Sequence, residues 1–301
     1  MLELLFFLTG VADGVGGWRA YGVDPGRFSR AVMRHCERLV LSGRSDLRKP
    51  CFLIAQSYED VLTSKDSILG SATFCIICLQ RDERRIYTAS LGDCGFLVVR
   101  GGRVIQRSTH QKHAFNTPFQ LASPPPIHSI HFHHDLPAQA TQSSIDVEPG
   151  DLLVVGTDGL FDNLTETMIL EEVCTIRLSD DGILEGLHRC ARCLVDRARS
   201  AAFTPNFQSP IAKEARRYGI NIVAGAPGDV TVIVGLIFLD EDRPRTAEDP
   251  CPTTGSWVRA TPQISSVIRR NTHIYSNPNS LLFEAAPCNM LLRRSQSVPR
   301  F

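Results

Sequence analysis

Apolar residues recur with a helical period near the start of the chain and with a strand-like pattern further on. A helix is predicted to begin at Asp24 and Pro25, because Asp is a favoured N-cap and Pro a favoured first helical residue, and to stop at Gly43. A second helix is predicted over about 52–62. Apolar runs of strand length indicate buried strands, and the glycine pair at 101–102 indicates a hairpin. The predicted strands cover 4–8, 71–80, 84–93, 95–107, 152–156 and 231–239.

Two more helices are predicted before the last strand. One covers about Thr165–Arg177, and the other begins with Asp180 or Asp181 as its N-cap and carries apolar residues on one face. From Glu241 onward Pro, Ser, Thr, Asn and Arg dominate, and the apolar residues are scattered. We therefore expect one folded domain over 1–240 and a disordered tail over 241–301.

The polar stretch at 109–145 contains three consecutive prolines and six of the nine histidines. Loops of this length are usually functional or disordered. The histidines could bind a transition metal, but composition alone favours a variable flap whose histidines face solvent. The role of its histidine-rich segment, 128–134, stays open. The six histidines are His110, His113, His128, His131, His133 and His134.

The overall charge and the placement of the cysteines exclude some classes of function. Lys+Arg and Asp+Glu both number 32, so nothing in the overall charge indicates binding to nucleic acid or to an anionic membrane. No apolar run approaches the roughly 18 residues of a membrane span. The ten cysteines include pairs in strand-like and helical patterns, such as Cys75 with Cys78, which indicates small core residues in a reducing compartment. The C-x-x-C spacing leaves a structural zinc site as an alternative.

Acidic residues stand beside glycines where predicted strands meet loops, at Asp13, Asp93, Asp158 and Asp229. The first strand is predicted to break into a loop that contains Asp13. Hard oxygen ligands without a partnering set of Cys or His suit Mg²⁺ or Mn²⁺. Several such carboxylates, if they converge, could hold two ions about 3.5–4 Å apart, an arrangement that activates water for attack on a phosphoester. Because the sequence contains no P-loop, nucleophile elbow or Cys-Arg phosphatase loop, metal-assisted hydrolysis is the leading hypothesis.

The order of five motifs resembles the metal-dependent PPM (type 2C) family of Ser/Thr protein phosphatases, over about 9–239. The motifs are VADGVGGW at 11–18, GSATFCIICL at 70–79, ASLGDCGFLVVRGG at 89–102, VVGTDGLFDN at 154–163 and PGDVTVIV at 227–234. The resemblance implies an α+β fold, a four-layer α-β-β-α sandwich of two antiparallel sheets flanked by helices. It also implies hydrolysis of phosphoserine and phosphothreonine in phosphoprotein substrates, with no covalent enzyme intermediate.

Site roles follow from the resemblance, residue by residue. Asp13 would bridge two Mg²⁺ or Mn²⁺ ions, and the carbonyl of Gly14 would ligate one of them. Asp158 would ligate the other ion, and Asp93 matches a carboxylate associated with a third, weaker metal site. A water shared by the two ions would attack phosphorus. Asp229 is a candidate ligand or a residue just behind the ligands.

Two departures from the family pattern leave a second function open. The family begins with a strand that carries a basic phosphate contact and a first acidic motif, and this chain is expected to lack both. Gly228 stands where the last motif normally has its ligating Asp. The alternative to an active phosphatase is therefore a pseudophosphatase that acts as a binding module.

Location and partners are inferred from shorter signals. Val15 in place of the usual His, FNTPFQL at 115–121 and the Ser209-Pro210 segment are similar to the mitochondrial branch of the family, which implies a mitochondrial location. Because no presequence is visible, the cytoplasm is the alternative. In the tail, an arginine pair ahead of Ser297 resembles a phospho-dependent adaptor (14-3-3) site, with an unmodified tail as the alternative.

Overall fold

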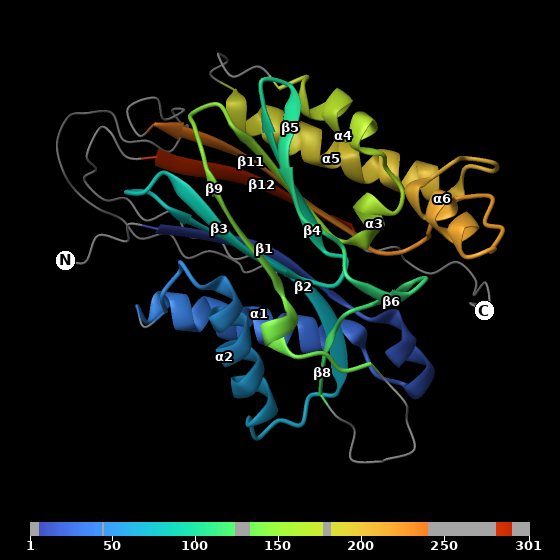
Figure 1. Cartoon of the computed structure of the whole chain (residues 1–301), viewed down its shortest axis with the longest axis horizontal. Helices are drawn as coiled ribbons and strands as arrows, with labels where there is room; N and C mark the ends of the chain where they lie inside the picture. The colour runs from blue at the N-terminus through green and yellow to red at the C-terminus, as the bar shows by residue number, and fades with distance from the viewer. Residues whose placement is uncertain (1–5, 44, 124–132, 177–181, 240–280, 291–301) are drawn as a thin grey trace.

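A computed structural model of the protein describes residues 6–43, 45–123, 133–176, 182–239 and 281–290 (Figure 1). In this part of the chain two antiparallel sheets lie face to face. Sheet A has the order β1 (Phe6–Gly14), β2 (Gly70–Gln80), β3 (Arg85–Leu91) and β9 (Thr141–Asp146), and β8 (Leu121–Ser123) also pairs with β2. Sheet B has the order β12 (Leu281–Met290), β11 (Val230–Leu239), β10 (Leu152–Gly156), β4 (Gly95–Arg100) and β5 (Arg103–Arg107). A separate hairpin joins β6 (Lys112–Ala114) to β7 (Thr117–Pro118).

Helices cover both outer faces of the sheet pair (Figure 1). Sheet A is covered by α1 (Pro25–Leu41) and α2 (Pro50–Leu62), and sheet B by α5 (Ile183–Phe203) with α4 (Glu166–Val173). The remaining helices are short: α3 (Asp158–Phe161), α6 (Pro210–Arg217) and the 3-10 helices η1 (Gly16–Tyr21) and η2 (Pro137–Gln139). The predicted α-β-β-α sandwich is confirmed.

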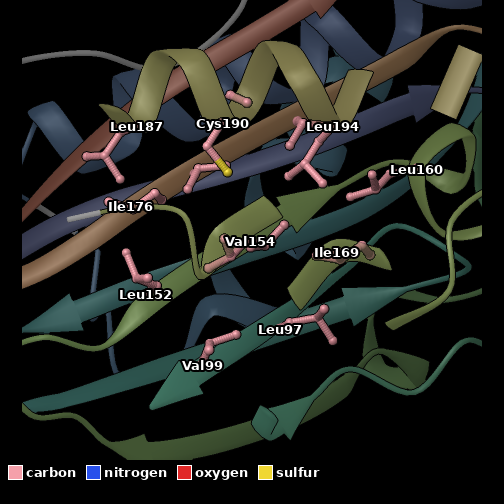
Figure 2. Close-up of a cluster of buried hydrophobic side chains, with 14 of the residues drawn as sticks. Leu97, Val99, Leu152, Val154, Leu160, Ile169, Ile176, Leu187, Cys190 and Leu194 are labelled. Atoms are coloured by element: carbon pink, nitrogen blue, oxygen red, sulfur yellow. The ribbon is translucent and has the colours of Figure 1, made fainter. Parts of the chain in front are cut away.

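Three hydrophobic clusters fill the spaces between these four layers, and the pleat of the strands explains them. In β10, Val154 packs with the residues under α5 (Figure 2). Its neighbour Val155 belongs to the cluster between the sheets. In β2, Cys78 faces α1 and Cys75 faces the other sheet. Successive residues of a strand point to opposite faces, so strands buried on both sides read as continuous apolar runs. This alternation also places Cys75 and Cys78 in different cores, where they cannot share one zinc ion.

Several predicted boundaries are confirmed by local chemistry. The Asp24 side chain accepts a hydrogen bond from the Gly26 amide at 3.0 Å, which caps α1. The second helix is observed as α2. At the β4–β5 turn both glycines adopt positive φ, +55° and +75°, as a two-residue hairpin requires.

Other boundaries differ from the prediction. The break expected within the first strand is wrong: β1 continues to Gly14, because Asp13 and Gly14 pair with Thr73 and Ala72 of β2. Helix α4 ends at Val173, earlier than predicted. The N-cap of α5 is Gly182, and the predicted caps at 180 and 181 lie outside the described residues.

Five strands were not predicted: β6, β7, β8 and β9 in or beside the polar stretch, and β12 in the expected tail. Residues 281–290, within the expected tail, form β12, which pairs along the whole length of β11. The edge of β11 opposite β10 offers unpaired amides and carbonyls that another strand can satisfy, and this backbone preference leaves little trace in composition.

No helix in the described ranges is long and apolar enough to cross a membrane.

Candidate metal centre

The predicted acidic residues meet at one edge of the sandwich because of the strand register. Asp13 stands at the end of β1, and Asp93 lies in the turn from β3 to β4, which joins the two sheets. Asp158 is the first residue of α3, two residues after the end of β10, and Asp229 comes just before β11. The end of β10 lies opposite the start of both β4 and β11, since Gly156 pairs with Gly95 and with Val232, the third residue of β11. Antiparallel pairing therefore carries four distant stretches of the chain to a common edge.

The β1 end of the site is held by tight backbone packing. A Cβ atom at Gly14 would lie 2.1 Å from the carbonyl oxygen of Pro25, so only glycine fits where α1 approaches the strand. Beyond it, the Val15 amide donates to the Ser71 carbonyl at 3.0 Å. The Trp18 indole donates to the Ser71 hydroxyl at 2.7 Å, which anchors the loop to β2. These contacts fix the path of the chain after Asp13, at the end of β1.

The β10 end is organised by α3 and the segment ahead of β11. A Cβ atom at Gly159 would lie 2.3 Å from the Asp229 carbonyl oxygen, so the helix and this segment are in direct backbone contact. The Asn163 side chain donates to the carbonyls of Gly159 and Ala226, both at 2.9 Å, and accepts from the Ala226 amide at 2.8 Å. This amide clamp holds the entry to β11 against the helix that carries Asp158.

The carboxyl groups of the site repel one another strongly. Loss of water raises the pKa of Asp13 well above its usual range, and Asp158 raises it further through its charge and a shared hydrogen bond. Asp93 and Asp229 add to the effect. The neighbours that act on Asp13 are thus all acidic. A bound cation would relieve their mutual repulsion.

Asp93 lies deeper than Asp13, with 3% of its surface exposed. Burial raises its pKa to about 7, Asp158 contributes in the same direction, and Lys112 opposes them. Behind it, Cys94 is fully buried, and burial together with the charge of Asp13 raises the pKa of its thiol. The floor of the site is therefore dry, and charge there is poorly solvated.

A hard divalent cation fits this donor set by its chemistry. The ligand atoms on offer are carboxylate oxygens and the Gly14 carbonyl, which suit Mg²⁺ and Mn²⁺. Within the described ranges, no three His, Cys, Asp or Glu side chains are already arranged to hold one ion. Binding would therefore require the carboxylates, starting with the Asp13–Asp158 pair, to turn toward a common point.

Asp229 occupies the rim of the cluster. Its carboxylate accepts a hydrogen bond from Arg19 at 3.4 Å, and its side chain is 36% exposed. The structure thus brings Asp13, Asp93 and Asp158 together and leaves Asp229 at the edge, bonded to a guanidinium.

Sequence reasoning missed three charged residues of this region. Asp162 lies one helical turn after Asp158 and is 5% exposed; the D-x-x-x-D spacing on a short helix was the available signal. Burial, followed by the charge of Asp158, raises its pKa well above the usual range. Lys112 of the β6–β7 hairpin lies 3.8 Å from Asp162, and Glu214 of α6 pairs with Lys112. Neither stands in a recognisable motif, so only the fold identifies them.

The described histidines of the polar stretch, His110, His113, His133 and His134, are exposed, as expected, but they also have protein partners. His113 bonds to both oxygens of Asp135 at 3.0 Å and stacks between Phe119 and His133. His134 bonds to the Tyr58 hydroxyl at 3.1 Å. These rings have specific protein partners because the stretch folds back on α2 and β8. Residues 124–132, which include His128 and His131, lie outside the described residues.

Comparison with known proteins gives three consistent findings. Residues 53–205 match the Stage II sporulation protein E (SpoIIE) family. The chain is 45% identical over 230 residues to a protein phosphatase PTC7 homolog of Xenopus laevis, covering 76% of each. It is 46% identical over 230 residues to the Homo sapiens protein phosphatase PTC7 homolog, covering 76% of this chain and 75% of the relative.

A solved structure supports the same assignment at the level of the fold. The X-ray structure of the photosystem II phosphatase PBCP superposes with a TM-score of 0.63 and 28% sequence identity, covering 76% of this chain and 89% of that one.

Proposed function

The chain belongs to the metal-dependent PPM-type family of Ser/Thr protein phosphatases, and from this premise we propose how its own residues carry the reaction. Its substrates are phosphoproteins, and its activity depends on a divalent metal. The phosphatase relatives favour an enzyme over the binding-module alternative.

Asp13 and Asp158 are the central metal ligands in this proposal. The observation that carries it is their placement: β1 and β10 end at the same edge of the sandwich, and after burial the charge of Asp158 is the largest influence that raises the pKa of Asp13. The Gly14 carbonyl completes the set from the end of β1, and Asp93, in the β3–β4 turn, is proposed as a ligand of a third, weaker site. When bound, two Mg²⁺ or Mn²⁺ ions supply a water of lowered pKa and positive charge for the phosphoryl oxygens.

The protein's own contribution is to hold these ligands rigidly and to keep the floor dry. Asp13 is held by the pairing of β1 with β2, and Asp158 by α3 and the Asn163 clamp. Buried carboxylates in a dry floor attract a dication more strongly than solvated ones would. Asp229 is proposed as a rim ligand that turns from Arg19 to the metal, a role that its exposure permits.

Hydrolysis of a phosphoserine peptide, measured with and without Mn²⁺, tests this proposal. The wild type should release phosphate only with metal, and Asp158→Asn should remove the activity while the protein stays folded. Asp82→Asn is the matched control, because Asp82 is an exposed acid in the β2–β3 turn. Wild-type activity no higher than that of Asp158→Asn would refute the assignment.

The kind and number of ions are tested by calorimetry. We propose two sites that accept Mg²⁺ or Mn²⁺, since both ions take oxygen ligands. Titration of each ion into metal-free protein should give tight binding that Asp13→Asn weakens. One bound ion per chain would contradict the two-ion assignment.

The domain extent and the location are proposed on the family resemblance. The phosphatase domain corresponds to 1–240, although β12 adds a strand from beyond that boundary. A mitochondrial location, with the cytoplasm as the alternative, is tested by fractionating cells that express the full natural protein. Recovery in the cytosolic fraction alone would contradict it.

The adaptor proposal concerns Ser297, which lies outside the described residues. Phosphorylation there would add charge and acceptor oxygens that an adaptor can recognise. A phosphorylated peptide of the last residues should bind a 14-3-3 protein, and the same peptide without phosphate should not. Equal binding of both peptides would rule out a phospho-dependent site.

A further inference from the structure

Lys112 is a buried cation beside the acidic cluster. Its side chain is 10% exposed, and its ammonium lies 2.9 Å from Glu214 Oε2 and 3.8 Å from Asp162 Oδ1. A lysine is seldom buried to this degree unless it is paired. Here three acidic groups act on it, Asp162 and Glu214 first and Asp93 next, and they raise the pKa of Lys112 despite its burial. The ammonium is therefore charged at neutral pH.

Backbone hydrogen bonds fix Lys112 and both of its partners next to the centre. The Gln111 amide, one residue before Lys112, donates to the Gly92 carbonyl at 2.8 Å, one residue before Asp93. The Ile211 amide at the start of α6 donates to the Asp162 carbonyl at 3.1 Å. Main-chain bonds that do not depend on the lysine charge thus tie the hairpin to the β3–β4 turn and tie α6 to the end of α3.

The charge of Lys112 acts most strongly on one side of the cluster. It lowers the pKa values of Asp93 and Asp162, whereas the leading influences on Asp13 are burial and other acids. Asp93 and Asp162 therefore have a cation of their own, supplied by the protein. A divalent ion that approached this side would meet an ammonium already in place, and like charges at this range repel.

We propose that Lys112 is a built-in cation that opposes metal binding on the Asp93–Asp162 side of the centre, and that Glu214 holds it back from the metal ligands. This proposal rests on the proposed function, since it concerns how tightly the same centre binds its ions. Lys112 is a positioning residue here: it touches Asp162 and Glu214, and it acts on the metal through charge.

The two partners should then have opposite effects on metal affinity. Lys112→Met keeps the apolar stem but removes the charge, so Mn²⁺ should bind tighter, on the order of tenfold. Glu214→Gln removes the acid that holds the ammonium back and leaves it closer to Asp162 and Asp93, so Mn²⁺ should bind more weakly, on the order of threefold or more. The double variant should bind Mn²⁺ tighter than Glu214→Gln but more weakly than Lys112→Met, because the charge of Glu214 also acts directly on Asp93 and Asp162.

Isothermal titration of Mn²⁺ into metal-free protein, with melting temperatures measured with and without Mn²⁺, tests the proposal. Lys213→Met is the matched control, since Lys213 is the exposed neighbour of Glu214 and loses the same charge; its affinity should equal that of the wild type. Lys112→Arg keeps the charge and should also bind as the wild type does.

The outcomes separate this inference from the proposed function. If the wild type binds no Mn²⁺, the metal centre itself is refuted. If the wild type binds but Lys112→Met and Glu214→Gln both weaken binding, the ion pair is only a structural tie and the inference is overturned. Unchanged affinity in both variants overturns it as well. Should Lys112→Met fail to fold, Glu214→Gln and Lys112→Arg decide: equal Mn²⁺ affinity in these two variants overturns the proposal.

Discussion

The two halves of the acidic cluster are built from the same residue type but are neutralised differently. In the Asp13–Asp158 half, carboxyl groups from two sheets face each other, and the neighbours that act on Asp13 are acids. In the Asp93–Asp162 half, the lysine of a hairpin supplies a positive charge. A group of buried acidic residues is therefore not by itself a metal site, because the protein can supply its own cation. The half without its own cation is the one that needs a metal ion.

The largest expected effect comes from removing a charge in the Asp13–Asp158 half. Asp158→Asn should lower Mn²⁺-dependent phosphatase activity by about a thousandfold, the scale of several kcal/mol of lost charge stabilisation. The same change should raise the melting temperature of the metal-free protein, because it relieves repulsion on Asp13. Both are measured against Asp82→Asn. A metal-free protein made less stable by Asp158→Asn would contradict the picture of unrelieved repulsion.

The next effect is the pH dependence of the metal-free protein. The folded pKa of Asp93 is about 7, whereas an unfolded Asp titrates near 4. Between these values the folded state holds a proton that the unfolded state has lost, so stability falls as the pH rises, by roughly 1 kcal/mol per unit. Asp13 and Asp162, whose pKa values are also raised, act in the same direction.

Denaturant unfolding in a chelator from pH 4 to pH 8 measures this slope. Asp93→Asn should flatten it, and saturating Mn²⁺ should remove it because the metal replaces the protons. A metal-free protein whose stability is level across this range would show that the cluster is better neutralised than the structure indicates.

A smaller effect is expected from the backbone that positions Asp13. Gly14→Ala would force a Cβ atom against the Pro25 carbonyl and should lower the free energy of unfolding by about 2 kcal/mol. Gly17→Ala, three residues on, meets nothing within 4 Å and should leave stability nearly unchanged. Thermal melts compare the two. Equal stability of both variants would mean that α1 does not pin the end of β1.

The smallest effect is expected at the rim. The Arg19–Asp229 pair is exposed, and such pairs contribute about 1 kcal/mol at most. Arg19→Ala should therefore change stability by less than this amount, while freeing Asp229 to turn inward. Mn²⁺ affinity measured by calorimetry should stay the same or rise by less than threefold. A large loss of affinity would show that Arg19 helps to position a ligand.

Which residues of this site could be predicted from the sequence depended on the residues beside them in the chain. Asp13, Asp93 and Asp158 were found because glycines beside an acid at a strand end leave a readable pattern. Asp162 was missed although it stands four residues after Asp158, since it follows a helix and no glycine stands beside it. Lys112 and Glu214 are 102 residues apart and meet only through the packing of a hairpin on α6.

The fold, too, could be predicted only where a segment carries its own local pattern. Strands buried on both faces were readable from continuous apolar runs, and α1 was readable from its Asp24 cap. The extent of β1 was misjudged because glycine was taken as a break, whereas Gly10 and Gly14 pair regularly with β2. Pairing across a sheet depends on the partner strand, so a single segment does not reveal it.

The most direct test of the central claim, that the acidic cluster is the metal centre of a phosphatase, combines two readings of one Mn²⁺ titration. Calorimetric binding and phosphate release from a phosphoserine peptide are measured on the same metal-free samples of wild type and of Asp13→Asn. We predict that activity rises with metal occupancy in the wild type and that both readings collapse in the variant. Undiminished binding and activity in Asp13→Asn would contradict the claim.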